Sequence, residues 1–330
     1  MNKRYLFPIV LAILAIVALL VFFPPPAGTN GEPDPTPTVT ETPIPTPPPT
    51  TIPPTTAPLP EPEEGVLESP YVFVYNSGTD TMYYTSGGED TRIAPASLTK
   101  LLTALVVLEV LEEDQVITAG SELSLVHPES SLAYISRGQK LRVDMLIEGL
   151  LLQSGNDAAY ILAVAAGREV ANNPDLSAKG ALRRFVEHMN YRAKEMGLEN
   201  THYENPDGID GEDHYTCLKD LATVSVLAMK NPTIRKYVKM DSHFVTYESG
   251  QTITWSNTNE LLHKDSKYYC ADAVGLKTGT TTKAGNCLIS AFPKDGGYLF
   301  IGVLGGPSYY GRYKDTLHLY NLYKDYKAYP

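Results

Sequence analysis

Residues 93–111 read IAPASLTKLLTALVVLEVL, a proline turn followed by Ser97, Lys100 and an almost wholly apolar run. The leucines and valines of this run cover most of a helix circumference, which predicts a central, buried helix rather than an amphipathic one. Ser97 and Lys100 are three residues apart at the start of this helix, so their side chains lie on one face, one turn apart. The stretch therefore sets an amine and a hydroxyl together at the head of a core helix.

The pairing of Ser97 with Lys100 predicts a nucleophile and its base. A lysine beside an apolar core is partly desolvated, which favours the neutral form that accepts protons. A serine hydroxyl is a weak nucleophile until such a base lies within hydrogen-bond reach. The free N–H groups at the helix N-terminus suit a developing oxyanion. Alone the pattern is weak, because a capping serine with a solvated lysine has the same spacing.

A second stretch, QSGND at residues 153–157, strengthens this hypothesis. It places Ser154 and Asn156 in a polar break between two apolar helices predicted at 143–153 and 157–167. A hydroxyl and an amide are unusual between such helices unless they face a cleft, although a helix-capping loop would also use them.

A third stretch, GLKTGTT at residues 275–281, reads as a strand. Alternation along the strand sends Lys277 and Gly279 to one face and Thr278 to the other. Gly279 leaves room for a ligand backbone to approach, whereas an edge strand with a solvated lysine is the plainer alternative. All three stretches in this order fit one serine acyl-transfer site better than three coincidences.

The remaining pattern predicts a mixed α/β (α+β) fold. Residues 71–86 indicate a hairpin around a Ser-Gly-Thr-Asp turn, and three runs within 275–306 indicate an antiparallel meander. We expect the hairpin and the meander to share one sheet, with a helical lobe inserted between them. Further helices are predicted at 181–197, at 216–231, where Asn231-Pro232 ends the helix, and at 313–329.

The three short motifs resemble those of penicillin-binding proteins and class A β-lactamases. Longer stretches are similar to low-molecular-weight D-alanyl-D-alanine carboxypeptidases over about residues 68–312, among them LLLQSGNDAAYILA, HYTCLKDLA and GLKTGTTTKAGNCLISAF. The resemblance implies the penicillin-binding protein/β-lactamase-like fold and a serine carboxypeptidase that removes the terminal D-Ala from peptidoglycan stem peptides. It also implies covalent inhibition by penicillin and other β-lactams.

The resemblance also implies a role for each motif residue, with no metal and no cofactor. The catalytic residues are the acylated Ser97, its base Lys100, and the proton relay Ser154. The substrate-binding residues are Asn156, Lys277, Thr278 and Gly279, with Lys277 drawing the terminal carboxylate of the peptide. The oxyanion hole is formed by the backbone N–H groups of Ser97 and Thr280. The nearby charges Asp157 and Lys283 are assigned no role.

The chain is expected to have three parts. Residues 1–23 carry Lys3 and Arg4 before 19 uncharged, mostly apolar residues, which predicts a signal anchor crossing the cell membrane. Residues 24–64 are rich in proline and threonine and predict a disordered exterior stalk. Residues 65–330 form the catalytic domain. The next basic residue after Arg4 is Arg92, so the N-terminus should be cytoplasmic and the catalytic domain extracellular, or secreted if the signal is cleaved.

Composition excludes several functions. The formal net charge is −11 and no basic cluster is present, so no nucleic-acid partner is expected. Cys217, Cys270 and Cys287 lack metal-ligand spacing, which favours buried small hydrophobes, with one disulfide left open.

Other functions stay open beside the carboxypeptidase. A β-lactamase would need a carboxylate that activates the deacylating water, and Glu204, Asp207 and Asp210 are candidates without a matching motif. An anchored wall-binding protein with a dead site, or an adhesin stalk, is the alternative from another class. A Ser-His-Asp hydrolase lacks Gly-x-Ser-x-Gly, and a metalloprotease lacks His-Glu-x-x-His.

Overall fold

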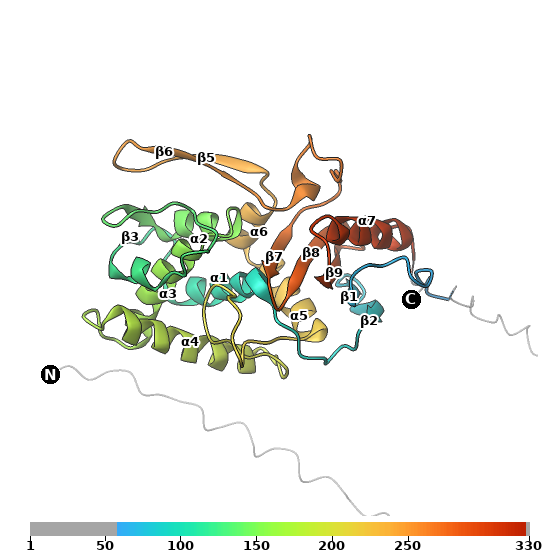
Figure 1. Cartoon of the computed structure of the whole chain (residues 1–330), viewed down its shortest axis with the longest axis horizontal. Coiled ribbons are helices and arrows are strands. Elements are labelled where there is room, and N and C mark those ends of the chain that lie inside the picture. The colour runs from blue at the N-terminus through green and yellow to red at the C-terminus, as the bar shows by residue number, and fades with distance from the viewer. Residues whose placement is uncertain (1–57, 328–330) are drawn as a thin grey trace, which may run out of the picture. The chain divides into compact units, whose positions relative to one another are not determined.

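A computed structural model describes residues 58–327 of the chain, so the predicted anchor and most of the predicted stalk lie outside the described residues. A central antiparallel sheet has the strand order β2-β1-β9-β8-β7 (Figure 1). Its strands are β1 (Tyr71–Asn76), β2 (Thr81–Ser86), β7 (Leu276–Thr281), β8 (Gly285–Lys294) and β9 (Gly297–Gly306). The predicted sheet that joins the early hairpin to the late meander is confirmed, with β1 pairing directly to β9.

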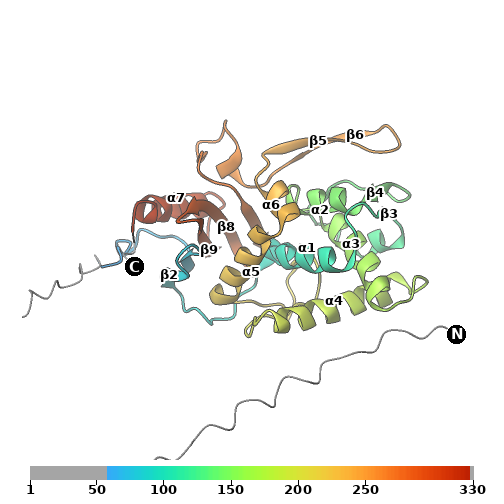
Figure 2. The same ribbon diagram turned by 180° about the vertical axis from the view of Figure 1, so that it is seen from behind.

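The helical lobe lies between β2 and β7 in the chain and beside the sheet in space (Figures 1 and 2). Its helices are α1 (Thr99–Val110), α2 (Val143–Leu151), α3 (Asn156–Val170), α4 (Ala178–Glu195), α5 (Leu218–Lys230) and α6 (Pro232–Val238). The helix α1 is buried from Thr99 to Val107, as its apolar circumference predicts. The last helix, α7 (Gly311–Tyr323), is shorter at its C-terminal end than the predicted 313–329 and packs along β9 and β8.

Alternation along the strands builds two hydrophobic cores, one on each face of the sheet. On β1, Phe73 belongs to the large core shared with the helical lobe, whereas Val72 and Val74 belong to the core beneath α7. On β9, Phe300 and Ile301 divide between the two cores in the same way. Successive side chains of a strand point to opposite faces, so one sheet carries both layers.

The conformations of two hairpin turns are explained by the residues that form them. In the β1–β2 hairpin, Gly78 N donates to Asn76 Oδ1 at 2.9 Å, which closes the predicted Ser-Gly-Thr-Asp turn. Between β8 and β9, Asp295 and Gly296 have φ values of +51° and +78°. Two consecutive positive φ angles are the requirement of a tight type I′ hairpin turn, which favours Asp-Gly.

The structure adds a helix, α6 (Pro232–Val238), that the sequence did not predict. Helix α5 ends before Asn231-Pro232 as expected, but Asn231 then caps α6 through its side chain and Pro232 occupies the first turn of that helix. Two small two-stranded sheets stand outside the central sheet: β3 (Val116–Thr118) with β4 (Lys140–Arg142), and the hairpin of β5 (Ser242–Thr246) with β6 (Thr252–Ser256), a segment whose sequence is β-rich.

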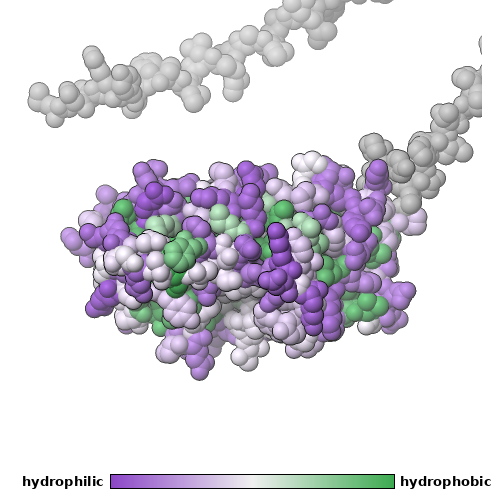
Figure 3. All heavy atoms as spheres, turned by 90° about the horizontal axis from the view of Figure 1, so that it is seen from above, coloured by the Kyte–Doolittle hydropathy of each residue, from purple (hydrophilic) through white to green (hydrophobic). Residues whose placement is uncertain are grey.

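The surface seen in Figure 3 is largely hydrophilic, with small separate apolar spots. Cys217, Cys270 and Cys287 are all unpaired, and the first and last of these are buried. Within residues 58–327 there is no helix with the length and apolar character needed for crossing a bilayer. Pro60, in the predicted stalk, contacts the domain, because Tyr323 Oη donates to its carbonyl at 2.5 Å.

Candidate active site

Ser97 lies in a short 3₁₀ turn, Ala96–Leu98, that leads directly into α1. Ser97 is partly exposed, whereas Ala96 and Leu98 on either side are buried. Ala96 has a φ of +50°, a left-handed conformation that costs an alanine on the order of 1–2 kcal/mol. The surrounding structure must therefore hold the serine at a strained turn.

Two glycines from different elements contact this turn. A Cβ atom on Gly208, in the loop between α4 and α5, would lie 1.9 Å from the carbonyl oxygen of Ala96. A Cβ atom on Gly279, in β7, would lie 2.9 Å from the backbone nitrogen of Ser97. Figure 1 shows the start of α1 beside β7. Both approaches require the absence of a side chain, so the two glycines fix the Ser97 backbone by direct contact.

A buried histidine braces the same turn. Thr99 Oγ1 donates to the carbonyl of Ala96 at 2.9 Å and lies 2.9 Å from His214 Nε2. The other ring nitrogen, Nδ1, accepts from the backbone N–H of Glu204 at 3.1 Å, so the proton of the neutral ring is on Nε2. Burial lowers the pKa of His214 to about 4, which keeps the ring neutral and this arrangement intact.

Lys100 reaches Ser97 as the spacing predicts. Its Nζ donates to Ser97 Oγ at 2.8 Å and to the backbone carbonyl of Asp207 at 2.6 Å. Lys100 is fully buried, more completely than the sequence suggested. Burial lowers its pKa to about 8, while the negative charges of Asp207 and Asp157 oppose that shift. A substantial fraction of the amine is therefore neutral near physiological pH, and neutral amine can accept the proton of the Ser97 hydroxyl.

Ser154 and Asn156 lie between α2 and α3, in the predicted polar break. Ser154 is buried with a φ of +57°, and its carbonyl accepts from Ser131 Oγ at 3.2 Å. Asn156 donates from Nδ2 to Ser130 Oγ at 2.8 Å. Its carbonyl oxygen, Oδ1, is buried and has no hydrogen-bond partner among the described residues. A buried amide oxygen without a partner is costly, and an incoming N–H donor would satisfy it.

The strand β7 carries Lys277, Thr278, Gly279 and Thr280 at the edge of the central sheet. Lys277 is buried, and its Nζ donates to the carbonyl of Thr278 at 3.1 Å. The pKa of Lys277 is lowered well below its ordinary value by burial and by the nearby positive charges of Lys100 and Arg312. Several basic groups gathered behind one strand make the site receptive to an anion.

Arg312, in α7, is a residue of this region that the sequence analysis missed. It is buried, and its Nη1 lies 3.3 Å from each of three acceptors on β7 and β8: Gly279 O, Thr280 Oγ1 and Cys287 O. The guanidinium lies over the ring of Tyr309, with Cζ 4.2 Å from its centroid. Arg312 thus supports the end of β7 and adds positive charge there.

The three carboxylates considered for water activation separate in the structure. Glu204 accepts from the backbone of Asp213, and Asp210 accepts from Thr281 Oγ1 and Lys283 N at the end of β7. Of the three residues, Asp207 contacts Lys100, and it does so through its backbone carbonyl. It is buried with 1% of its surface exposed, so it is not open to a bulk water.

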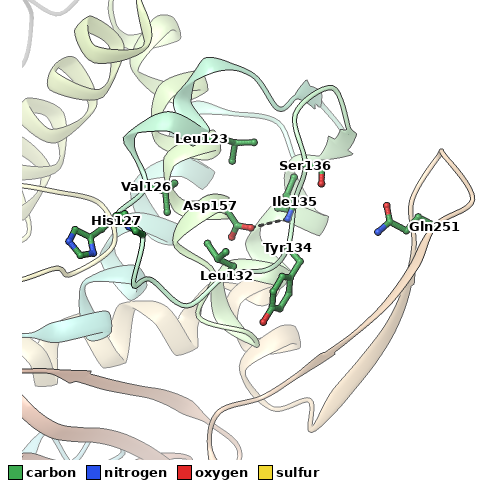
Figure 4. A pocket seen from close by; sticks show the side chains of 10 residues that line it. Leu123, Val126, His127, Leu132, Tyr134, Ile135, Ser136, Asp157 and Gln251 are labelled. Carbon is green, nitrogen blue, oxygen red and sulfur yellow. Dashed lines mark hydrogen bonds between the residues drawn. The ribbon is translucent and has the colours of Figure 1, made fainter.

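The predicted bystanders Asp157 and Lys283 have structural roles. Asp157 accepts from the backbone N–H groups of Ala133 and Ile135 at 2.8 and 2.9 Å, which holds the loop over the start of α3 (Figure 4). A pocket of about 480 Å³ lies on that loop, lined by Asp157, Tyr134 and Gln251 among others, and Ser97 is not part of its lining. Lys283 donates from Nζ to the carbonyl of Gly211 at 2.9 Å.

A partly exposed serine hydrogen-bonded to a buried lysine, on a turn in contact with a glycine of the edge strand β7, is the arrangement expected of a serine acyl-transfer enzyme that uses lysine as its base. Comparison with known sequences agrees. The chain belongs to the D-alanyl-D-alanine carboxypeptidase family, which it matches over residues 68–308. The predicted family and fold are both confirmed.

Individual relatives show the extent of the similarity. The chain is 35% identical to the D-alanyl-D-alanine carboxypeptidase of Streptomyces sp. (strain K15) over 76% of its own length and 84% of that protein. It is 30% identical to a carboxypeptidase of Bacillus subtilis over 66% of its own length but only 52% of that longer protein.

Solved structures give the same result. The Streptomyces K15 DD-transpeptidase has a TM-score of 0.69 and 33% identity, covering 78% of this chain and 97% of that one. Penicillin-binding protein D2 from Listeria monocytogenes, in its ampicillin-bound form, has a TM-score of 0.62 and 27% identity over the same shares.

Proposed function

We propose that this chain is a serine carboxypeptidase that removes the terminal D-Ala from peptidoglycan stem peptides through an acyl-enzyme on Ser97. The observation that carries the proposal is the 2.8 Å contact between Ser97 Oγ and the buried amine of Lys100. Membership of the D-alanyl-D-alanine carboxypeptidase family supplies the substrate class.

The proposed acylation uses the described groups in order. Ser97 Oγ attacks the carbonyl carbon of the penultimate D-Ala, and its proton passes to the neutral Lys100. The carbonyl oxygen takes the negative charge and is stabilised by the N–H groups of Ser97 and Thr280. Ser154 relays a proton to the leaving nitrogen as the C–N bond breaks. Water then hydrolyses the ester on Ser97.

Two features of the site are suited to substrate binding: an amide oxygen without a hydrogen-bond partner, and basic side chains close to β7. The unpartnered Oδ1 of Asn156 is suited to accept from an N–H group of the stem peptide. The positive charge of Arg312 attracts the terminal carboxylate, and that carboxylate in turn favours the ammonium form of Lys277, whose pKa is lowered in the free protein.

The direct test is release of D-Ala from diacetyl-Lys-D-Ala-D-Ala by the purified chain. Products are identified by mass, because a related protein is known as a DD-transpeptidase and an amine acceptor would give a different product from water. Absence of D-Ala release together with absence of penicillin labelling would contradict the proposal and favour a wall-binding protein with a dead site.

We predict that penicillin inhibits by forming a long-lived adduct of about one molecule per protein. The leaving amine of an opened penicillin stays tethered and obstructs water, whereas a released D-Ala diffuses away. Among the three carboxylates considered, Asp207 is sealed from bulk water and the other two are engaged elsewhere, so none is placed to speed deacylation. Intact-mass measurement over time checks this. An adduct that disappears within seconds while penicillin is consumed in large excess would identify a β-lactamase instead.

We also propose that residues 1–23 anchor the protein in the cell membrane, with the catalytic domain extracellular. The support is the apolar run from Tyr5 to Phe23, preceded by Lys3 and Arg4. We predict that the mature protein fractionates with membranes and that cleavage between residues 30 and 57 releases an active soluble domain. The cut is placed before Pro60, which contacts the domain. A mature N-terminus found after Phe23 would show that the signal is removed.

A further inference from the structure

Asp207 is a buried carboxylic acid in the loop between α4 and α5, and no role has been given to it above. Its backbone carbonyl accepts from Lys100 Nζ at 2.6 Å, which brings the residue against the base of the proposed reaction. Its side-chain Oδ1 has only a long contact of 3.5 Å from the backbone N–H of Ile209. Its Oδ2 is buried and has no hydrogen-bond partner in the part of the chain from 58 to 327.

A buried carboxylate with so few donors is expensive unless a positive charge lies near it. Burial raises the pKa of Asp207, and the positive charge of Lys100 is the largest influence that opposes this. The same interaction seen from the amine keeps the pKa of Lys100 from falling further. The two buried groups therefore influence each other's titration.

Other charged or titratable groups influence the pair from the surrounding elements. Asp157 at the start of α3 acts on Lys100, but it already accepts from backbone N–H groups of the loop above it. Burial and the charges of Lys100 and Arg312 lower the pKa of Lys277 on β7, His127 lowers the pKa of Asp207, and His214 is neutral. Tyr160 on α3 stays protonated, because burial and Asp207 raise its pKa. Asp207 thus exerts the larger of the two negative influences on the base.

We propose that Asp207 is a positioning residue for catalysis, whose carboxylate balances the positive charge that Lys100 acquires when it takes the Ser97 proton. The inference rests on the proposed function. In the acylation step the Ser97 O–H bond breaks, Oγ bonds to the substrate carbonyl carbon, and the proton forms the Lys100 ammonium beside Asp207. The proton leaves again through Ser154 to the departing nitrogen, so neither Lys100 nor Asp207 retains it at the end of the step.

The loop gives this role a structural basis. Gly208 follows Asp207 directly and contacts the carbonyl of Ala96, so the same loop holds the backbone of the nucleophile and the charge beside the base. The loop is fastened in turn by Asn205, whose side chain accepts from Gly208 N at 2.7 Å and donates to Ile209 O at 2.8 Å. One short segment therefore sets the relative position of nucleophile, base and counter-charge.

The test is the pH dependence of acylation by fluorescent penicillin, measured with the full-length chain in detergent. For the unaltered protein the rate should rise with pH through about 8, because acylation needs neutral Lys100. In Asp207→Asn the loss of the negative charge should move this rise to lower pH by about one unit or more, because an opposite charge near an amine raises its pKa and this variant removes that charge. The plateau should fall as well, because the amine is then a weaker base. The matched control is Glu212→Gln, an exposed carboxylate of the same loop, which should leave the rise in place.

The outcomes separate this inference from the proposed function. A lower plateau in Asp207→Asn with an unmoved rise would mean a merely structural role and would overturn the inference. If the variant does not fold, the unaltered protein still decides, because a buried lysine without a counter-charge titrates near pH 5–6 and a rise there would overturn the inference too. No labelling of the unaltered protein at any pH, with no D-Ala release, would instead remove the proposed function.

Discussion

Ser97→Ala is expected to abolish both covalent labelling by fluorescent penicillin and release of D-Ala. The hydroxyl is the atom that bonds to the substrate, and loss of the nucleophile in a serine protease costs on the order of 10⁶-fold in kcat. Gel fluorescence and a D-Ala assay measure the two effects. The fold should be unaffected, because Ser97 is partly exposed and its turn is held by backbone contacts with Gly208 and Gly279.

The control for this variant is Ser124→Ala, which removes a hydroxyl that bonds only to the nearby Ser121 carbonyl. It should label at the rate of the unaltered protein. Labelling that persists in Ser97→Ala would place the nucleophile elsewhere and would withdraw the assignment of Lys100 along with it.

Lys100→Ala should slow acylation by about 10²- to 10⁴-fold, the usual effect of losing a positioned base. The variant leaves Ser97 without the amine now 2.8 Å from its hydroxyl and leaves the Asp207 carbonyl without its donor. Stopped-flow labelling with fluorescent penicillin gives the rate, and circular dichroism during heating shows whether the variant folds.

Lys219→Ala, at an exposed position on α5, is the matched loss of an ammonium group and should not change the labelling rate. A folded Lys100→Ala protein that acylates within about tenfold of the unaltered rate would show that another group takes the serine proton.

The three motifs could be predicted because each consists of residues close together in the sequence, whose relative positions are set by a single helix, loop or strand. Ser97 and Lys100 are one helical turn apart, so the helix itself brings them together. Ser154 and Asn156 interrupt two apolar helices, and the β7 motif has a glycine in a strand, which are features visible within a few residues. The sheet was predictable for the same reason, because each strand has a short β-rich run with turn residues beside it.

The rest of the site depends on contacts between distant segments. Asp207 lies in a stretch that reads only as turns and His214 follows that stretch directly, and their approach to the Ser97 turn depends on how the loop after α4 folds back. Arg312 looks like any basic residue of a C-terminal helix until that helix is placed behind β7. Asn231-Pro232 correctly indicated a helix end, but asparagine and proline also begin helices, and here they do both.

The positive φ of Ala96 could not be predicted either. Alanine disfavours this conformation, and nothing in its neighbours requires it. The turn is instead packed closely against Gly208 and Gly279, which belong to other elements. At the turn before Ser97, packing against other elements therefore outweighs the preference of Ala96 for a negative φ.

The pairing of β1 with β9 has a consequence for the order in which the protein folds. Tyr71 lies opposite Leu304, and Ser69 N donates to Asp315 Oδ2 across a separation of 246 residues. During synthesis nearly the whole domain is made after the β1–β2 hairpin and before β9, the strand that pairs with β1. The helices between β2 and β9 form from residues that are close together in the sequence. Such non-local pairing is the slow part of folding and leaves a strand edge open meanwhile. The lobe that carries Ser97 and Ser154 can thus take shape early, but β7, which completes the cleft, is among the last strands to arrive.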